Sequence, residues 1–319
     1  MNREAVCFDE KERDGSVTII SVYYNREKSV DESVNSLINQ KYNNYKIILV
    51  DDGSTDNTFN ELKKFESENC IVYTKENTGF VDSITRAIDS TNSEFIAIHG
   101  SGDISYDERI EKQVEVFRKY SQVGVVGAHC EVYNEITKQV SLFNIKSGLI
   151  PDCETELIKN NFLTQGEVMF RRSVYDDVGG YSSLYTFAQD YDLWLRMSKV
   201  TEFYVIPNVI YRRISKPDGV SGNISKLVMQ QYLASFARRN RSKDIYNQEH
   251  LQLAIHKVDH KFRKFMLRQI AKSHTRKVSK SDMDVLERFL SSEFGKLFSK
   301  LSLLSIKITQ KLRFKHGAI

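Results

Sequence analysis

The chain has 319 residues, of which 40% are hydrophobic and 28% are charged. This composition is ordinary for a globular protein and excludes a disordered chain, a collagen and a small disulfide scaffold. No apolar run approaches the roughly 18 residues of a membrane-spanning helix. The N-terminus lacks the apolar stretch of a secretory signal, and the four cysteines lie far apart with no CxxC pair. We therefore expect a cytoplasmic protein with neither a zinc site nor a disulfide framework.

The charge is unevenly distributed along the chain. The overall net charge is +4, but residues 226–319 hold 21 Lys and Arg against 7 Asp and Glu, a net charge of +14. Residues 1–225 hold the remaining 25 Lys and Arg against 35 Asp and Glu, a net charge of −10. This asymmetry suggests a body that carries a basic module. Because the pattern beyond about residue 220 is helical and Pro217-Asp218-Gly219 precedes it, we expect a body over residues 1–220 and a basic helical C-terminal region over residues 221–319. A basic region can face a membrane surface, a nucleic acid or an acidic polymer, or be a solvated helical surface.

Strands and helices alternate through the body. Short β-branched or apolar runs predict buried strands, and apolar residues at helical spacing predict amphipathic helices between them. The strands are expected at Val17–Tyr23, 45–50, 70–73 and 94–98, and the helices at 29–40, 59–65, 80–88 and 109–120. Further on, we expect an extended segment at 123–126, a helix at 154–160, a strand at 168–171 and a helix at 190–199.

Repeated alternation predicts an α/β fold, a mainly parallel sheet with helices on both faces. In such sheets ligands bind beyond the carboxyl ends of the strands. Polar residues follow the predicted strands at Asn25, Asp51-Asp52, Asn77 and Gly102-Asp103. We therefore expect four loops to converge on one crevice that carries carboxylates and carboxamides.

Several common ligand sites are excluded by their motifs. Neither GxGxxG nor GxxxxGK[ST] follows the first strand, which argues against a nicotinamide dehydrogenase or a P-loop enzyme. An EF-hand is excluded because Asn57 and Lys63 replace its Gly and Glu. What remains is a nucleotide site in which the base stacks on Tyr24 and a carboxylate accepts its ring N–H. The alternative for residues 51–54 is a strand-to-helix turn with an N-cap.

Taken in order, several segments resemble family 2 glycosyltransferases, which are inverting, sugar-nucleotide-dependent enzymes with the GT-A fold. The matching segments are 17–25, 33–40, 48–56, Asn77-Thr78-Gly79, 95–109, Arg171-Arg172-Ser173, 178–181 and 189–196. The resemblance implies a GT-A catalytic domain with a C-terminal helical extension, a UDP- or dTDP-linked sugar donor, and a glycan or lipid-linked acceptor. The QxxRW signature of processive relatives is missing, which predicts an enzyme that adds one residue per encounter.

The resemblance also implies roles for single residues. The nucleotide-binding residues would be Tyr24, Asn25, Asp52, Asn77 and Gly79, with Asp51 supporting the turn. Asp190 would be the general base that takes the proton of the acceptor hydroxyl, although an aspartate there can also be a helix N-cap. Arg212 and Arg213 follow a predicted strand. One of them would reach the diphosphate, and Arg212 is the candidate.

Asp103 falls where the acidic metal motif of the family ends. It would bind Mg²⁺ or Mn²⁺, a hard cation that neutralises the leaving diphosphate. Gly100 and Gly102 occupy the earlier acidic positions, so weak metal dependence or none is equally consistent. His99 is either a ligand or a structural residue at the end of a buried strand. The loss of acids also supports an alternative function, a non-catalytic sugar-nucleotide-binding protein.

Residues 294–314 combine an apolar helical stripe with a neighbouring stripe of lysines. Such a helix can lie in a membrane interface or pack on the catalytic domain. We therefore expect a protein of the cytoplasm, peripheral at the inner face of an anionic membrane if the helix is interfacial, that acts in cell-envelope polysaccharide biosynthesis. No helix-turn-helix, RNA-recognition or zinc pattern supports a nucleic-acid partner.

Overall fold

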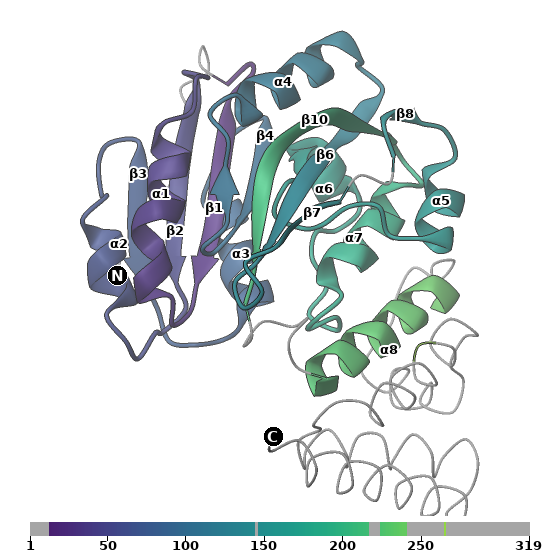
Figure 1. Cartoon of the computed structure of the whole chain (residues 1–319). Helices are drawn as coiled ribbons and strands as arrows, with labels where there is room; N and C mark the ends of the chain where they lie inside the picture. The colour runs from purple at the N-terminus through teal and green to yellow at the C-terminus, as the bar shows by residue number, and fades with distance from the viewer. Residues whose placement is uncertain (1–12, 144–145, 217–223, 241–264, 266–319) are drawn as a thin grey trace, which may run out of the picture. The chain divides into compact units, whose positions relative to one another are not determined.

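The structure is a computed structural model, shown in Figure 1, that describes residues 13–143, 146–216, 224–240 and 265. Its contacts divide the chain into two units, residues 1–216 and 217–319, and each unit is described by itself. The domain boundary expected near residue 220 stays a prediction of the sequence.

One sheet runs through the first unit, with the strand order β3-β2-β1-β4-β9-β6-β10-β5. Its first half is parallel and consists of β1 (Val17–Tyr23), β2 (Tyr45–Asp51), β3 (Cys70–Thr74) and β4 (Phe95–Gly100). All positions of β1 are buried, because it lies between two other strands and is covered on both faces. The four strands expected from the sequence are confirmed, each ending within two residues of its predicted end.

The second half of the sheet mixes directions. The short strand β9 (Met169–Arg171) is antiparallel to both of its neighbours, β4 and β6 (Val123–Asn134). The long strand β10 (Glu202–Ser215) runs parallel to β6. Three further strands pair antiparallel with these: β5 (Ile104–Ser105) and β8 (Gly148–Ile150) with β10, and β7 (Val140–Phe143) with β6.

Helices cover both faces of the sheet (Figure 1). The helices of this unit are α1 (Val30–Ile38), α2 (Thr58–Lys63), α3 (Phe80–Asp89), α4 (Arg109–Lys119), α5 (Cys153–Lys159), α6 (Arg172–Asp177) and α7 (Gln189–Met197), with a 3₁₀ turn, η1 (Glu27–Ser29). One core cluster joins α1, α2 and α4 to alternate residues of β1 and β2, such as Ile19 and Ile47. Their neighbours Ile20 and Ile48 are equally buried but lie outside that cluster, and α3 contacts β1 and β2. The expected α/β fold with helices on both faces is therefore confirmed.

The strand expected at 168–171 is confirmed as β9, but two other predicted strands were too short. The extended segment expected at 123–126 is the start of β6, which continues to Asn134. Its second part alternates buried and partly exposed residues, so no continuous apolar run marks it. Arg212 and Arg213 were expected to follow a strand, but they lie inside β10, whose pairing with β6 continues through Ser215.

The second unit is described only in part. Its described helix is α8 (Ile224–Asn240), in which residues 233–238 are buried. The amphipathic helix expected at 294–314 lies outside the described residues. Within the part of the chain that the structure describes, no helix is both long and apolar enough to cross a bilayer.

Candidate active site

The loops after β1, β2 and β3 are tied together by hydrogen bonds at the carboxyl edge of the sheet. Asn25, after β1, has a positive φ of 53°, and its Oδ1 accepts from the backbone N–H of Thr55, at an N···O distance of 2.8 Å. Gly53, after β2, has a φ of 71°, and a Cβ atom there would lie 2.6 Å from the backbone nitrogen of Asn77. Glycine is therefore required at position 53, because any side chain would push the third loop away.

The two aspartates after β2 differ in their partners. Asp51 is buried, and its carboxylate accepts from the hydroxyl of Thr74 at 2.6 Å and from the backbone N–H of Ser54 at 3.3 Å. These bonds close the turn, which is the supporting role expected for Asp51 from the sequence.

Asp52 binds the third loop. Its Oδ1 accepts from Lys75 Nζ at 2.6 Å, Ser83 Oγ at 2.8 Å and the Thr78 N–H at 3.2 Å. Its Oδ2 accepts from the Gly79 N–H at 3.0 Å. A carboxylate offers about four acceptor positions, two on each oxygen. By this count Oδ2 can accept one further hydrogen bond, although only 3% of Asp52 is exposed.

Tyr24 and Asn77 are two further candidates for nucleotide binding. Tyr24 is 46% exposed, so its ring is available for stacking. Asn77 is exposed, and its side chain makes no hydrogen bond to another residue in the described part of the chain. The hydrogen bonds of Asp51 fit the turn interpretation of residues 51–54, and the nucleotide interpretation stays a prediction.

Asp103 lies after β4 and holds the end of β10. Its Oδ2 accepts from the Tyr211 hydroxyl at 2.7 Å, and its Oδ1 accepts from the Ile214 N–H at 2.8 Å. Only 9% of the residue is exposed. Burial raises the pKa of Asp103 to about 6, although these two bonds and the charges of Arg213 and Lys216 act to lower it.

The donor set around Asp103 does not fit a divalent cation held by the protein. A Cβ atom on Gly100 would overlap the Asp103 carboxylate, so this carboxylate fills the space where a side chain at position 100 would begin. A Cβ atom on Gly102 would lie 3.1 Å from Lys216 Nζ. Among the described residues, no three His, Cys, Asp or Glu side chains group as metal ligands. The cation stays a prediction of the sequence that the residues at this position do not favour.

His99 is held inside the protein. Its Nε2 lies 3.0 Å from Ser33 Oγ, and its Nδ1 lies 3.1 Å from Ser105 Oγ. Burial and the charge of Arg109 lower the pKa of His99 to about 3, so the ring is neutral at physiological pH. Arg109 is itself fully buried, donates to Ser105 Oγ at 2.8 Å, and lies 4.9 Å from the ring centroid of Tyr211. Of the two roles considered for His99, the structure favours the structural one.

Asp190 lies in the first turn of α7. The N-cap of this helix is Ala188, so Asp190 does not cap it. Burial raises the pKa of Asp190 to about 6, against the opposing effects of backbone N–H groups in the first turn and the charge of Arg213. The side chain is partly exposed. A raised pKa makes Asp190 a stronger base than an ordinary aspartate while leaving it mostly ionised at neutral pH.

A chain of contacts links Asp103 to the start of α7. A Cβ atom on Gly166 would overlap the Tyr211 hydroxyl, so the loop before β9 passes directly over the group that binds Asp103. The next residue back, Gln165, donates to the Tyr181 hydroxyl at 3.2 Å and accepts from Gln189 Nε2 at 3.3 Å. The first half of the sheet and the helix of Asp190 therefore meet at one site. Sequence reasoning missed these residues, because the bonds join positions far apart in the chain.

Arg212 and Arg213 have different surroundings. Arg212 Nε donates to Glu131 Oε2 at 2.7 Å, and its guanidinium lies 5.9 Å from the ring centroid of Tyr106. Side chains alternate along a strand, so Arg213 projects to the same face of β10 as Tyr211, and Arg212 to the opposite face. The expected contact of Arg212 with a diphosphate stays a prediction, and its ion pair with Glu131 favours a different role.

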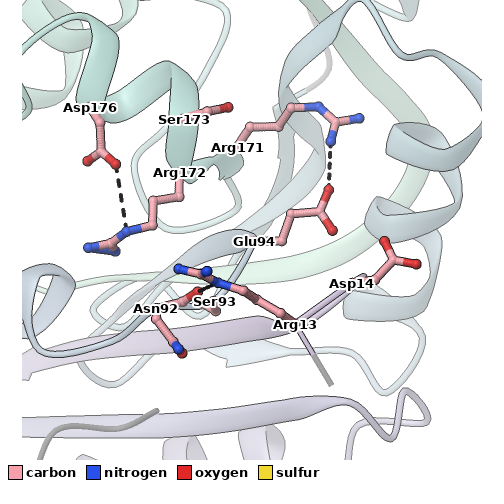
Figure 2. Close-up of a pocket in the computed structure, with 9 residues that line it drawn as sticks. All are labelled: Arg13, Asp14, Asn92, Ser93, Glu94, Arg171, Arg172, Ser173 and Asp176. Atoms are coloured by element: carbon pink, nitrogen blue, oxygen red, sulfur yellow. Dashed lines mark hydrogen bonds and ion pairs between the residues drawn. The ribbon is translucent and has the colours of Figure 1, made fainter. Parts of the chain in front are cut away.

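A cavity of about 430 Å³ lies at the other edge of the sheet, before β1 and β4 (Figure 2). Its cationic side chains are engaged by the protein. Arg171 pairs with Glu94 at 2.9 Å, and Arg172 Nε lies 3.7 Å from an Asp176 carboxylate oxygen. The cavity is remote in topology from the loops described above, so it is not the candidate site.

Known protein families, sequences and structures resemble this chain. The model of the family described as "Glycosyl transferase family 2" matches residues 18–179. The glycosyltransferase EpsE of Bacillus subtilis is 30% identical over 189 residues, covering 56% of this chain and 66% of that protein. An uncharacterized glycosyltransferase of Haemophilus influenzae is 31% identical over 196 residues, covering 58% and 60%. The crystal structure of S. aureus TarS 1–349 superposes with a TM-score of 0.56 at 16% identity, covering 95% of this chain and 93% of that one. Other TarS 1–349 structures are complexes with UDP and with UDP-GlcNAc.

Proposed function

Since this chain belongs to glycosyl transferase family 2, we propose that it transfers a sugar from a uridine- or thymidine-diphosphate donor to an acceptor hydroxyl. The matched segments span 66% of EpsE and 60% of the Haemophilus influenzae protein. The activity of the whole protein is therefore part of the proposal. The observation that carries it is the Asp52 carboxylate, which four protein donors fix and whose Oδ2 accepts only one of these four bonds.

The base specificity follows from that oxygen. Uracil and thymine each present a ring N–H, and Asp52 Oδ2 can accept it while the base stacks on the exposed ring of Tyr24. The complexes of TarS with UDP and UDP-GlcNAc support a uridine donor for a protein of this fold. UDP-GlcNAc is therefore the first donor to test.

The chemistry is a direct displacement at the anomeric carbon. The acceptor oxygen forms a bond to that carbon, the bond from the carbon to the diphosphate oxygen breaks, and its electron pair leaves with the nucleoside diphosphate. Asp190 takes the acceptor proton as the new bond forms, because the hydroxyl becomes more acidic as its oxygen attacks. Attack opposite the leaving group inverts the anomeric configuration, so an α-linked donor gives a β-linked product.

The acceptor we propose is a glycan or a lipid-linked glycan of the cell envelope, extended by one residue per encounter. A lipid-linked acceptor would place the enzyme at the inner face of a membrane, which suits the net charge of +14 over residues 226–319. The second candidate, a sugar-nucleotide-binding protein without activity, is favoured by Gly100 and Gly102 in place of acids.

A two-step experiment separates these functions. First, nucleotide sugars are screened for thermal stabilisation of the full chain, since a ligand at 100 times its Kd adds about 2.7 kcal/mol to the free energy of unfolding. Second, release of UDP from the best donor is compared in wild type and Asp190→Asn. Turnover that Asp190→Asn lowers by about 10²–10⁴-fold supports the transferase. Binding without turnover supports the second candidate, and no binding by any nucleotide sugar contradicts both.

A further inference from the structure

Two basic side chains stand at the end of β10, on the side of the candidate site. Arg213 lies two residues after Tyr211, and the pairing of β10 with β6 is regular from Tyr211 to Ser215. The side chains of Arg213 and Tyr211 therefore project to the same face of β10. On that face Tyr211 bonds to Asp103. Arg213 donates no hydrogen bond and forms no ion pair within the described part of the chain.

The second basic side chain, Lys216, lies beside Gly102, where an acid of the metal motif is expected. The ammonium of Lys216 lies 3.1 Å from where the Cβ atom of residue 102 would be, and it donates to Ser29 Oγ. The resemblance to family 2 glycosyltransferases implies an acid of the metal motif at this position. Here a positive charge of the protein lies where such an acid would begin.

Asp103 sets the position of both basic residues. Its Oδ1 accepts from the N–H of Ile214, which lies between Arg213 and Lys216 in the chain. Burial dominates the titration of Asp103 and Asp190, but the charge of Arg213 acts on both carboxylates and that of Lys216 acts on Asp103. Lys216 therefore lies near Asp103, and Arg213 lies near enough to act on both Asp103 and Asp190.

We propose that Arg213 and Lys216 stabilise the departing diphosphate in place of a divalent cation, and that Asp103 acts as a positioning residue for them. This inference rests on the proposed function. The planar guanidinium of arginine matches two phosphate oxygens, and the ammonium of lysine supplies a compact charge. Positive groups that are already fixed where charge develops lower the barrier without reorganisation at the moment of reaction. The chain then transfers sugar in the presence of a chelator.

The test measures binding of UDP and of uridine to the full chain, each in excess EDTA and in excess Mn²⁺. Uridine lacks the diphosphate, so the ratio of the two affinities isolates the diphosphate contacts. The variant Arg213→Met/Lys216→Met removes both charges. Arg213→Lys keeps both charges but loses the planar guanidinium, and it controls for structural damage. The matched control is Lys64→Met/Lys119→Met, which removes two exposed lysines at the opposite edge of the sheet.

We expect wild type to bind UDP equally well in EDTA and in Mn²⁺. The double variant should lose UDP affinity by about 10- to 100-fold, the usual effect of losing charge-assisted hydrogen bonds, while its uridine affinity changes by less than about twofold. Arg213→Lys should recover part of the loss, and the lysine control should match wild type.

Two results would overturn the inference and leave the proposed function standing: UDP binding by wild type only in Mn²⁺, or unchanged UDP affinity in the double variant. If wild type binds neither UDP nor uridine in either condition, the uridine donor is wrong and the inference falls with it. Circular dichroism of each variant confirms that lost binding is not lost folding.

Discussion

Asp190→Asn is expected to make the protein more stable and almost inactive. The folded protein raises the pKa of Asp190 from 3.8 to about 6, chiefly through burial. A folded-state pKa above the unfolded one means that ionised Asp190 opposes folding. The protonated form of Asp190 stabilises the folded protein. Its contribution is complete below the pKa of the unfolded state and is lost as the pH rises through about 6. Asparagine carries no charge at any pH and so avoids that loss.

The size of the gain follows from the shift. Each pKa unit corresponds to about 1.4 kcal/mol, so the two-unit shift sets an upper limit of about 3 kcal/mol at pH 8. The side chain is partly exposed, so we expect a gain of about 1–2 kcal/mol, vanishing below about pH 4. Urea unfolding can be followed by the fluorescence of Trp194, the single tryptophan of the chain, which is fully buried in the same helix as Asp190.

A second carboxylate provides the control of opposite sign. Asp82 has its pKa lowered to about 2, because hydrogen bonds from Thr78, Arg86 and Lys75 together outweigh the effect of burial. Its contribution to stability is present at neutral pH and is lost as the pH falls, so Asp82→Asn should destabilise the protein at pH 8. An Asp190→Asn protein that is no more stable than wild type at pH 8, or equally more stable at pH 4, would refute the reasoning.

Four further predictions concern rate, binding, packing and the tail. The rate of UDP release should fall about tenfold per pH unit below about pH 6, because Asp190 must be ionised to act as base; an initial-rate profile that stays flat to pH 5 would contradict this. Asp52→Asn should weaken UDP binding, measured by calorimetry, by about ten- to a hundred-fold and also lower the free energy of unfolding by about 1–3 kcal/mol, since the carboxylate serves four protein donors. Gly100→Ala should cost about 1–3 kcal/mol in urea unfolding, because the new methyl group displaces Asp103; unchanged stability would show that the carboxylate has room to move. The full chain should sediment with anionic vesicles and be released by salt, and deletion of residues 294–319 should abolish this.

The sequence predicts the first half of the fold well, because its signals are local. Each of β1 to β4 is a short run rich in apolar and β-branched residues, and polar residues follow these strands, as at Asp51 and Asn25. Burial of β1 and β2 on both faces removes the ambiguity of register that alternating strands carry. The positions of the carboxyl-edge loops follow directly from those ends.

The electrostatics of the site could not be read in the same way. The partner of Asp103 is Tyr211, 108 residues further along the chain. Whether Arg212 or Arg213 faces the site depends on the register of β10, and a shift of one residue exchanges their faces. Burial, which gives Asp190 a raised pKa in place of the ordinary value expected at a helix start, is likewise a tertiary property. The available signal was the order of Tyr211, Arg212 and Arg213, because side chains alternate between the two faces of a strand. This order assigns Arg213 to the face of Tyr211 only if the strand is known to continue through these residues.

The short strand β9 joins the two halves of the sheet, and this limits how the protein can be divided. Residues 169–171 bridge β4 and β6, so a fragment that ends after β4 leaves one whole edge of a buried strand open to solvent. Open edges of this kind favour pairing with other chains and aggregation. The parallel half of the sheet, which carries the proposed nucleotide-binding loops, therefore cannot be moved into another protein as a separate unit, although its motifs occupy a continuous stretch of sequence. Exchange of parts between relatives, in the laboratory or through recombination, should succeed only at junctions outside the sheet, and the nearest one follows residue 216.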